Sequence, residues 1–224
     1  MSYVKKSKSL TELVTKRLRK AIIENEYMLG EALSENSLAL KLGTSKTPVR
    51  EALALLKSEG LVNVYPQKGT YVFTLSLEEL KELIEIRLIL ESSALNLANK
   101  RNRENLLRSL GERISVMRDS LLVNDIDTYL LNDGEFHKCF FKYCDNRFLS
   151  DSYQMISGKS EALTHRISYR PNHPNKTYEE HEEIFFCLNK NNIENACKAL
   201  ESHLSTFEMF YIDQQGELVK KIDK

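Results

Sequence analysis

The chain of 224 residues contains no long apolar run. No stretch approaches the roughly 20 apolar residues that a helix needs to cross a bilayer. The first ten residues, MSYVKKSKSL, are basic but lead into no apolar segment, so we expect no secretory signal. Fixed-period repeats and low-complexity segments are missing as well. These absences indicate a globular protein that has no membrane partner.

Cysteine is scarce and shows no pattern. The four cysteines form no C-x-x-C pair and no obvious disulfide framework; they are Cys139, Cys144, Cys187 and Cys197. We therefore expect the reduced thiols of a cytoplasmic protein, and we assign them no role.

Net charge is also absent, because 32 Lys and Arg residues balance 32 Asp and Glu residues. The charges are nevertheless distributed unevenly along the chain. Residues 1–74 carry 12 basic and 7 acidic residues, whereas residues 75–224 carry 20 basic and 25 acidic residues. A basic first third and an acidic remainder predict two domains, 1–74 and 75–224, of which the first can approach phosphate.

The stretch 43–61, GTSKTPVREALALLKSEGL, predicts a helix with a single apolar stripe. The stripe recurs at i, i+3, i+4 and i+7, through Val49, Ala52, Leu53 and Leu56. Lys46, Thr47 and Arg50 lie off the stripe, at the beginning and on the open face of the helix. A recognition helix presents side chains to base edges and phosphates from these positions.

The surrounding elements complete a winged helix-turn-helix. Apolar periodicity predicts helices over 10–24 and 34–42, and Gly43 supplies the tight turn before the recognition helix. Residues 61–73 alternate apolar and polar side chains around the tip PQKG, which predicts a two-stranded hairpin. This wing tip is small and basic, so it can reach a DNA backbone or the minor groove.

The run LSENSLALKLGTSKTPVREALALLKSEGLVNVYPQKGTYV resembles the winged-helix domain of GntR-type bacterial transcription regulators. The resemblance implies that the following residues meet operator DNA: Asn36, Ser45, Lys46, Thr47, Arg50, Lys68 and Gly69. Lys46 and Asn36 stand where many relatives carry arginine, so the operator sequence cannot be transferred from relatives. The alternative role for Arg50 is a surface ion pair with Glu51 or another neighbour.

Residues 75–224 have the pattern of helix throughout. Apolar residues recur with a period of 3.6, and the breaks fall at short polar joins. The predicted helices span 79–100, 103–124, 126–143, 147–167, 177–190 and 193–214. The expected fold class is therefore mainly α, an N-terminal winged helix-turn-helix followed by an all-α antiparallel helical bundle.

Four residues of the bundle have the chemistry of metal ligands. Asp133 and His137 are four residues apart, so both project from one helical face. His181 and His203 lie 22 residues apart on the last two predicted helices, which can bring them level across an antiparallel pair. Three imidazoles and a carboxylate suit Zn²⁺, Ni²⁺ or another divalent first-row ion. The alternative is that each histidine is a hydrogen-bonded polar residue of the bundle.

The same region is similar to the FCD effector domain, which accompanies the FadR subfamily of GntR regulators. The similarity rests on EIRLILESSALNLA, on D-x-x-F-H at 133–137, and on H-x-x-I-x-x-x-L and A-x-x-x-L-x-x-H, which together span 181–203. It implies that Asp133, His137, His181 and His203 hold a divalent cation. We expect Zn²⁺, with Ni²⁺, Mn²⁺ or Fe²⁺ as alternatives.

Arg87, Arg166 and Arg170 are candidates for binding a small carboxylate effector beside the metal. Arg87 belongs to an E-x-R-x-x-x-E pattern that is typical of the family's first effector helix. An arginine that faces into a bundle needs an anion, which a bound carboxylate supplies. The alternative is an internal pair with Glu91 or Glu161.

Together these features predict a homodimeric, ligand-responsive regulator that binds double-stranded operator DNA, a metal ion and a small organic acid. We expect a repressor, with an activator as the alternative, and we do not expect an enzyme. Two rival interpretations remain at this point. One is a metal-dependent, hydrolase-like enzyme, since a metal ion with open positions can activate water. The other is a DNA-binding protein whose metal site is purely structural.

Overall fold

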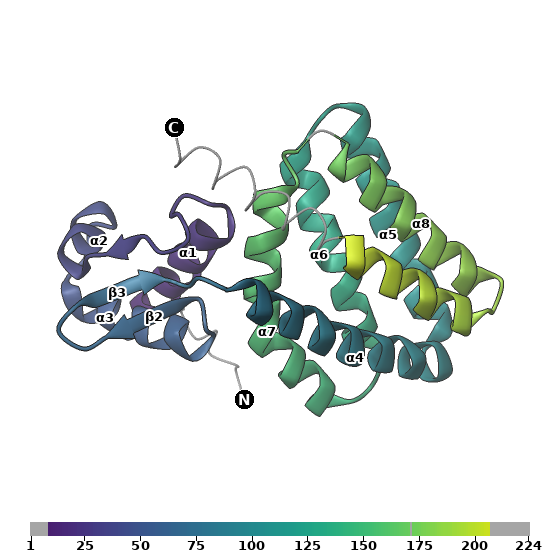
Figure 1. Ribbon diagram of the computed structural model, residues 1–224, viewed down its shortest axis with the longest axis horizontal. Coiled ribbons are helices and arrows are strands. Elements are labelled where there is room, and N and C mark those ends of the chain that lie inside the picture. The colour runs from purple at the N-terminus through teal and green to yellow at the C-terminus, as the bar shows by residue number, and fades with distance from the viewer. Residues whose placement is uncertain (1–8, 171, 207–224) are drawn as a thin grey trace, which may run out of the picture. The chain divides into compact units, whose positions relative to one another are not determined.

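The computed structural model describes residues 9–170 and 172–206 (Figure 1). The chain divides into two compact units, one that ends at Thr74 and one that begins at Leu75. Within the described residues, no helix has the combination of length and low polarity needed to cross a membrane.

The first unit is a winged helix-turn-helix with a three-stranded antiparallel sheet. Its elements are α1 (Leu10–Ile23), β1 (Ala32–Leu33), α2 (Glu35–Lys41), α3 (Lys46–Ser58), β2 (Val62–Tyr65) and β3 (Gly69–Val72). The strands lie in the order β1-β3-β2, so β3 is central. The sequence predicted only the β2–β3 hairpin, so β1 was missed. A strand of two residues is too short to produce an alternating pattern.

Helix α3 forms as its apolar stripe predicts. All four stripe residues are buried, and α3 packs against α1 through this face. The helix ends before Gly60, which adopts a φ of +70°, and the N–H of Leu61 bonds to the carbonyl of Leu56 at 3.0 Å. This left-handed C-terminal cap favours glycine. Ser45 occupies the N-cap position but makes no side-chain capping bond.

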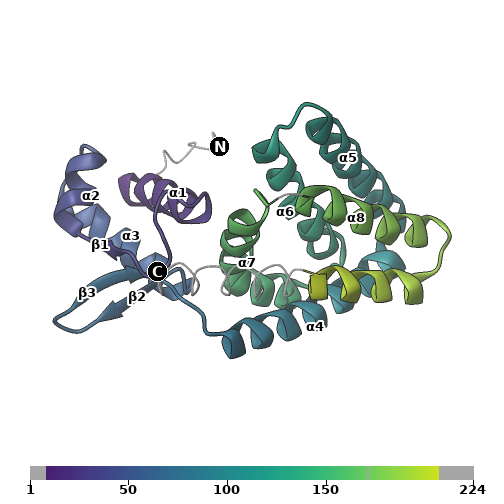
Figure 2. The same ribbon diagram turned by 45° about the horizontal axis from the view of Figure 1, so that its top comes forward.

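The second unit is a helical bundle. Its labelled helices are α4 (Leu77–Arg101), α5 (Arg103–Leu122), α6 (Ile126–Tyr143), α7 (Arg147–Ile167) and α8 (His173–Asn189). A further helix begins at residue 193 and continues to residue 206, where the described residues end; we call it the C-terminal helix. Helix α6 packs against α4, α5 and α7, which places it inside the bundle (Figure 2). The mainly α fold class is thus confirmed.

Local signals set the helix beginnings in the bundle. Ser76 and Glu79 form a capping box at the start of α4. Asp125 accepts from the N–H of Thr128 at 3.0 Å and caps α6. Asn146 caps α7 in the same way. Each of these side chains satisfies an N–H group that a helix end leaves unpaired.

Helix α8 departs from the prediction. It begins at His173, whereas the sequence placed His173 and Pro174 in a break and began the helix at Thr177. Proline in the first turn of a helix sacrifices no backbone hydrogen bond, so Pro174 starts the helix instead of preceding it. Pro171 of the same join lies outside the described residues, as does the part of the predicted last helix beyond residue 206.

The core of the bundle is apolar but contains charged groups. Tyr129, Phe136 and Phe140 of α6 are fully buried within it. The same interior holds polar side chains that are less than 9% exposed, among them Arg87, Glu91, Asp133, His137, His181 and His203. Burying such groups is costly unless they are paired or bind a ligand. The bundle is therefore organised around a polar centre.

Candidate metal centre and nucleic-acid interface

The open face of α3 carries the residues expected to meet DNA. Lys46 and Thr47 are exposed in its first turn, and the side chain of Arg50 is 69% exposed. Pro48 and the apolar stripe turn the opposite face into the domain core. Asn36 is exposed near the beginning of α2. These positions leave polar and basic side chains accessible along one side of the helix-turn-helix.

The wing tip is a tight turn between β2 and β3. Gln67 has a φ of +62° and Gly69 a φ of +113°, and the second value favours glycine strongly. Tyr71 donates its hydroxyl to the carbonyl of Lys68 at 3.1 Å and packs edge-on against Tyr65. The exposed Lys68 and Gly69 therefore lie at a tip that the two tyrosines brace.

Arg50 forms an ion pair, but with a residue that the sequence did not indicate. Its Nη2 atom lies 2.8 Å from Oε2 of Glu35 on α2. Glu51, the partner considered from sequence, instead accepts from the hydroxyl of Thr11 at 2.6 Å. The Arg50–Glu35 pair crosses the turn between two helices, so the spacing of side chains along one helix could not reveal it.

The three predicted histidine ligands come together in the bundle, and Asp133 lies beside one of them. His137 projects from α6, His181 from α8 and His203 from the C-terminal helix. Nε2 of His137 lies 3.3 Å from Nε2 of His181 and 3.2 Å from Nε2 of His203. Oδ1 of Asp133, one turn before His137, lies 3.5 Å from Nε2 of His181. Histidines from three separate helices therefore meet beside one carboxylate.

The donor set fits a first-row divalent ion. Ligand nitrogens about 2.0–2.1 Å from a shared zinc ion with tetrahedral angles are about 3.3–3.4 Å apart, close to the separations observed here. Burial, and then the neighbouring imidazoles, lower the pKa of His181 well below its usual value. The pKa of His203 is lowered in the same direction, again chiefly by burial. Both rings are therefore neutral near pH 7, the state in which imidazole binds metal.

Two carboxylates orient the histidines from behind. Oε2 of Glu91 lies 2.7 Å from Nδ1 of His137, and Oε2 of Glu180 lies 3.0 Å from Nδ1 of His203. A carboxylate at Nδ1 holds the proton there, so the lone pair of Nε2 points into the cluster. Glu180 also accepts from the hydroxyl of Thr206 at 2.7 Å. No pattern in the sequence indicates that either glutamate belongs to the site.

Arg87 forms an ion pair with one of these two carboxylates, that of Glu91. Its Nε atom donates to Oε1 of Glu91 at 2.8 Å, and both side chains are buried. Burial opposes ionisation of Glu91, but the charge of Arg87 and the hydrogen bonds from His137 and Arg87 outweigh it and lower the pKa of Glu91 to about 2. The internal pair that the sequence left as an alternative for Arg87 is thus present.

The other two candidate arginines have different surroundings. Nη1 of Arg166 donates to the carbonyl of Ala162 at 2.5 Å, within α7. Arg170 lines a separate pocket of about 320 Å³ beside the α5–α6 and α7–α8 joins. Pro174 lines the same pocket, and seven helical residues, or about 10 Å of helix axis, separate it from His181. None of the four candidate metal ligands lines this pocket.

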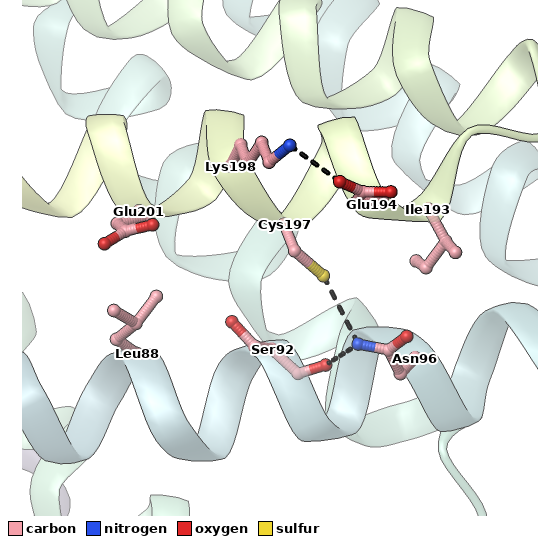
Figure 3. Close-up of a pocket in the computed structure, with 8 residues that line it drawn as sticks. All are labelled: Leu88, Ser92, Asn96, Ile193, Glu194, Cys197, Lys198 and Glu201. Carbon is pink, nitrogen blue, oxygen red and sulfur yellow. Dashed lines mark hydrogen bonds and ion pairs between the residues drawn. The ribbon is translucent and has the colours of Figure 1, made fainter.

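A second cavity is a groove of about 470 Å³ between α4 and the C-terminal helix (Figure 3). Cys197 points into it from the C-terminal helix, and Nδ2 of Asn96 donates to its sulfur at 3.3 Å. The Lys198–Glu194 ion pair, 2.7 Å long, lines the same groove. None of the four candidate metal ligands lines it, so it is distinct from the cluster. All four cysteines are free thiols.

A winged helix-turn-helix joined to a helical bundle defines a DNA-binding transcription regulator. The "FCD domain" model matches residues 82–206, and the "Bacterial regulatory proteins, gntR family" model matches residues 10–72. The chain belongs to the GntR family of bacterial regulators, in the group that carries an FCD domain.

Similar proteins from other bacteria are also named as transcription regulators. The chain is 26% identical to an HTH-type transcriptional regulator, YdhC, of Bacillus subtilis over 191 residues, which cover 84% of this chain and 85% of that protein. It is 29% identical over 136 residues to the gluconate operon transcriptional repressor of the same species, covering 61% of this chain and 56% of the repressor. It is 24% identical to the HTH-type transcriptional repressor RspR of Escherichia coli, covering 84% and 82%. These relatives are regulators, not enzymes, as expected for this chain.

Solved structures support the fold. McbR/YncC of Escherichia coli superposes with a TM-score of 0.81 and 22% identity, covering 93% of this chain and all of that one. A GntR transcriptional regulator from Rhodococcus sp. RHA1 gives a TM-score of 0.79 at 22% identity, covering 92% and 99%. The combination of winged helix-turn-helix and helical bundle is thus shared with known members of the family.

Proposed function

We propose that this protein is a ligand-responsive repressor that acts in the cytoplasm as a homodimer. Its bundle binds a divalent metal ion and a small organic acid, and its winged units bind operator DNA. The observation that carries this proposal is the meeting of three histidines and Asp133 inside the bundle. Two relatives are named as transcriptional repressors, which supports repression as the mode of control.

The metal would be held by Asp133, His137, His181 and His203. Three imidazoles and one carboxylate favour Zn²⁺, with Ni²⁺, Mn²⁺ and Fe²⁺ as alternatives. Held by four protein ligands, such an ion would accept an oxygen of the acid by expanding to five-coordinate. The protein's own part is to hold the Nε2 lone pairs toward one point, and Glu91 and Glu180 do this for His137 and His203 through the opposite ring nitrogens.

The acidic effector would bind next to this cluster. Arg87 supplies positive charge there, since its charge acts on both Glu91 and Asp133. Tyr153 of α7 is buried and stacks on Phe141 with ring centroids 4.0 Å apart. The charges of Glu91 and Arg87 both act on its hydroxyl. A carboxylate can therefore use Arg87 for its charge and the Tyr153 hydroxyl as a donor. Arg166 and Arg170 are further candidates.

The homodimer would form through the exposed faces of α4 and α7, which pack against each other. These faces expose large apolar side chains, among them Ile89 (61%), Phe148 (74%) and Met155 (66%). Ile86 of α4 and Lys159 of α7 line one shallow pocket, so the two faces are continuous. A second copy of the chain would cover this surface and supply the second winged unit that a palindromic operator needs.

Helix α4 connects the site to the DNA-binding unit along the chain. It begins at Leu77, three residues after the first unit ends, and it carries both Arg87 and Glu91. An effector that alters the contacts of Arg87 acts directly on this helix. Control of DNA binding then requires that the effector prefer one arrangement of the dimer over another.

The test combines metal, acid and operator. Protein loaded with Zn²⁺ is screened by thermal shift against a panel of small organic acids, with a chelator-treated sample as the control. Operator affinity is then measured by fluorescence anisotropy with each acid that binds. We expect at least one acid to raise Tm only in the loaded protein and to change operator affinity. If metal raises Tm but no acid alters operator binding, the metal site is structural and the proposal fails. Turnover of an acid that His181→Ala abolishes would instead establish the enzyme.

A further inference from the structure

Glu35 makes the closest polar contacts of Arg50, the residue at the centre of the recognition face. Nε of Arg50 lies 3.2 Å from Oε1 and 3.3 Å from Oε2 of Glu35, and Nη2 lies 2.8 Å from Oε2. The carboxylate therefore lies along the Nε–Nη2 edge of the guanidinium. Nη1 makes no hydrogen bond to any described residue.

An acid at this position needs an explanation. Glu35 lies beside Asn36 in the chain, and the hydrogen bond from Arg50, together with the charge of Lys46, lowers the pKa of Glu35. Its carboxylate is thus ionised at neutral pH and lies among residues expected to meet DNA. A negative charge on that surface repels phosphate and weakens binding to any sequence. The carboxylate of Glu35 must therefore have a role other than raising the affinity for DNA.

A structural role at the end of α2 is the simplest explanation. Glu35 is in the first, N-terminal turn of α2, where a negative charge interacts favourably with the helix dipole. Any carboxylate at this position would perform that role. The contacts with Arg50 also require a side chain of sufficient length, because it must reach across the helix-turn-helix to meet the guanidinium along one edge.

The geometry of guanidinium connects these contacts to base recognition. Arginine has five N–H groups in a planar fork, and two of its edges can donate two parallel hydrogen bonds. Glu35 occupies the Nε–Nη2 edge. The Nη1–Nη2 edge remains, and it matches the O6 and N7 acceptors of guanine. With the side edge fixed, rotation of the fork is restricted, and the free edge is presented in one orientation.

We propose that Glu35 is a positioning residue that sets the sequence specificity of the DNA interface by orienting Arg50 for end-on contact with a guanine. The inference rests on the assignment of α3 as the recognition helix. It predicts that Glu35 raises the ratio of operator affinity to non-operator affinity. At the same time, its charge lowers affinity for both kinds of DNA.

The test uses the full-length protein and two duplexes. One is selected by the wild-type protein from a random library, and the other has the same length and composition in scrambled order. Affinity for each is measured at fixed salt for the wild type, Glu35→Gln, Glu35→Asp and Glu51→Gln. The two Glu35 substitutions are repeated in an Arg50→Ala background. Circular dichroism at the assay temperature selects the variants that are folded.

We expect both Glu35 substitutions to lower the affinity ratio about tenfold when Arg50 is present and to leave it unchanged when Arg50 is replaced. Glu51→Gln, which removes an exposed carboxylate from α3, should leave the ratio unchanged. Glu35→Asp is decisive because it keeps the charge at the end of α2 but shortens the reach to Arg50. An unchanged ratio in Glu35→Asp overturns the inference, as does an equal fall in the Arg50→Ala background. If Arg50→Ala itself has no effect, the assignment of the recognition helix fails instead.

Discussion

Nδ1 of His137 lies 2.7 Å from Oε2 of Glu91, and no part of either side chain is appreciably exposed. Arg87 donates to the other oxygen of the same carboxylate. Arg87, Glu91 and His137 are thus linked by hydrogen bonds into a buried chain that ends at the Nε2 lone pair of His137. Because two of its members belong to α4, the orientation of a candidate metal ligand on α6 depends on a different helix.

Replacing Glu91 should therefore weaken metal binding without removing a ligand. We expect Glu91→Gln to lower zinc affinity about 10- to 100-fold, because the imidazole loses the acceptor that fixes its tautomer and orientation. Competition against a chromogenic chelator measures the affinity. Glu180→Gln, which affects His203 in the same way, should give a loss of similar size, whereas Glu183→Gln on the exposed side of α8 should not. Unchanged affinity in both Glu91→Gln and Glu180→Gln would show that the carboxylates do not orient the ligands.

Arg50 should contribute directly to operator recognition. We expect Arg50→Ala to weaken specific binding by about 1–3 kcal/mol and to relax the preference for guanine at one position of each half-site. Gel-shift titration against the selected operator and its single-base variants measures both effects. If operator affinity stays at the wild-type value, the recognition helix has been placed wrongly.

The apolar face of α4 should govern assembly. Ile89 is 61% exposed in the single chain, so Ile89→Glu should change the stability of the fold by less than about 0.5 kcal/mol. It should nevertheless convert dimers to monomers, because it places a charge in the proposed interface. Light scattering after size-exclusion chromatography measures the mass. Leu131→Glu on α6 is the matched control, since Leu131 is 66% exposed and lies outside this face. Dimers of Ile89→Glu as stable as those of the control would rule out this surface.

His173 should make the bundle sensitive to acid. Burial lowers its pKa from 6.5 to about 4, so below pH 6.5 the unfolded chain binds a proton that the folded chain resists. The folded state is therefore destabilised as pH falls from about 6.5 toward 4, by on the order of 2 kcal/mol between pH 7 and pH 5. Urea unfolding of chelator-treated protein at the two pH values measures this loss. His173→Asn should lose about 2 kcal/mol less than the wild type over the same interval, and equal losses would refute the assignment.

Local patterns predicted most of the architecture. The stripe through Val49 and Leu56, with Gly60 after it, defines α3 because burial and capping depend on residues within a few positions of one another. The bundle helices followed from the same periodicity. Two elements were predicted incorrectly, β1 and the beginning of α8. Strand β1 depends on pairing with the distant β3, which no local pattern shows. Pro174 is compatible with both a break and the first turn of a helix.

The candidate ligands were visible in the sequence, but their supports were not. His137 and His181 stand out because histidine is rare in this chain, with 5 in 224 residues. Glu91 lies 46 residues from His137, and Glu35 lies 15 residues from Arg50, so only the packing of different helices shows that they are partners. A chain with 32 acidic residues offers no local signal for choosing among them.

The central claim is that the bundle binds a divalent metal ion through residues from three helices. It is tested most directly by elemental analysis of protein that has been incubated with Zn²⁺ and exchanged into metal-free buffer. We expect about one ion per chain in the wild type and almost none in His181→Ala, while His165→Gln, which replaces a histidine outside the cluster, retains the wild-type content. Wild-type protein without metal, or His181→Ala with as much metal as the wild type, would contradict the claim.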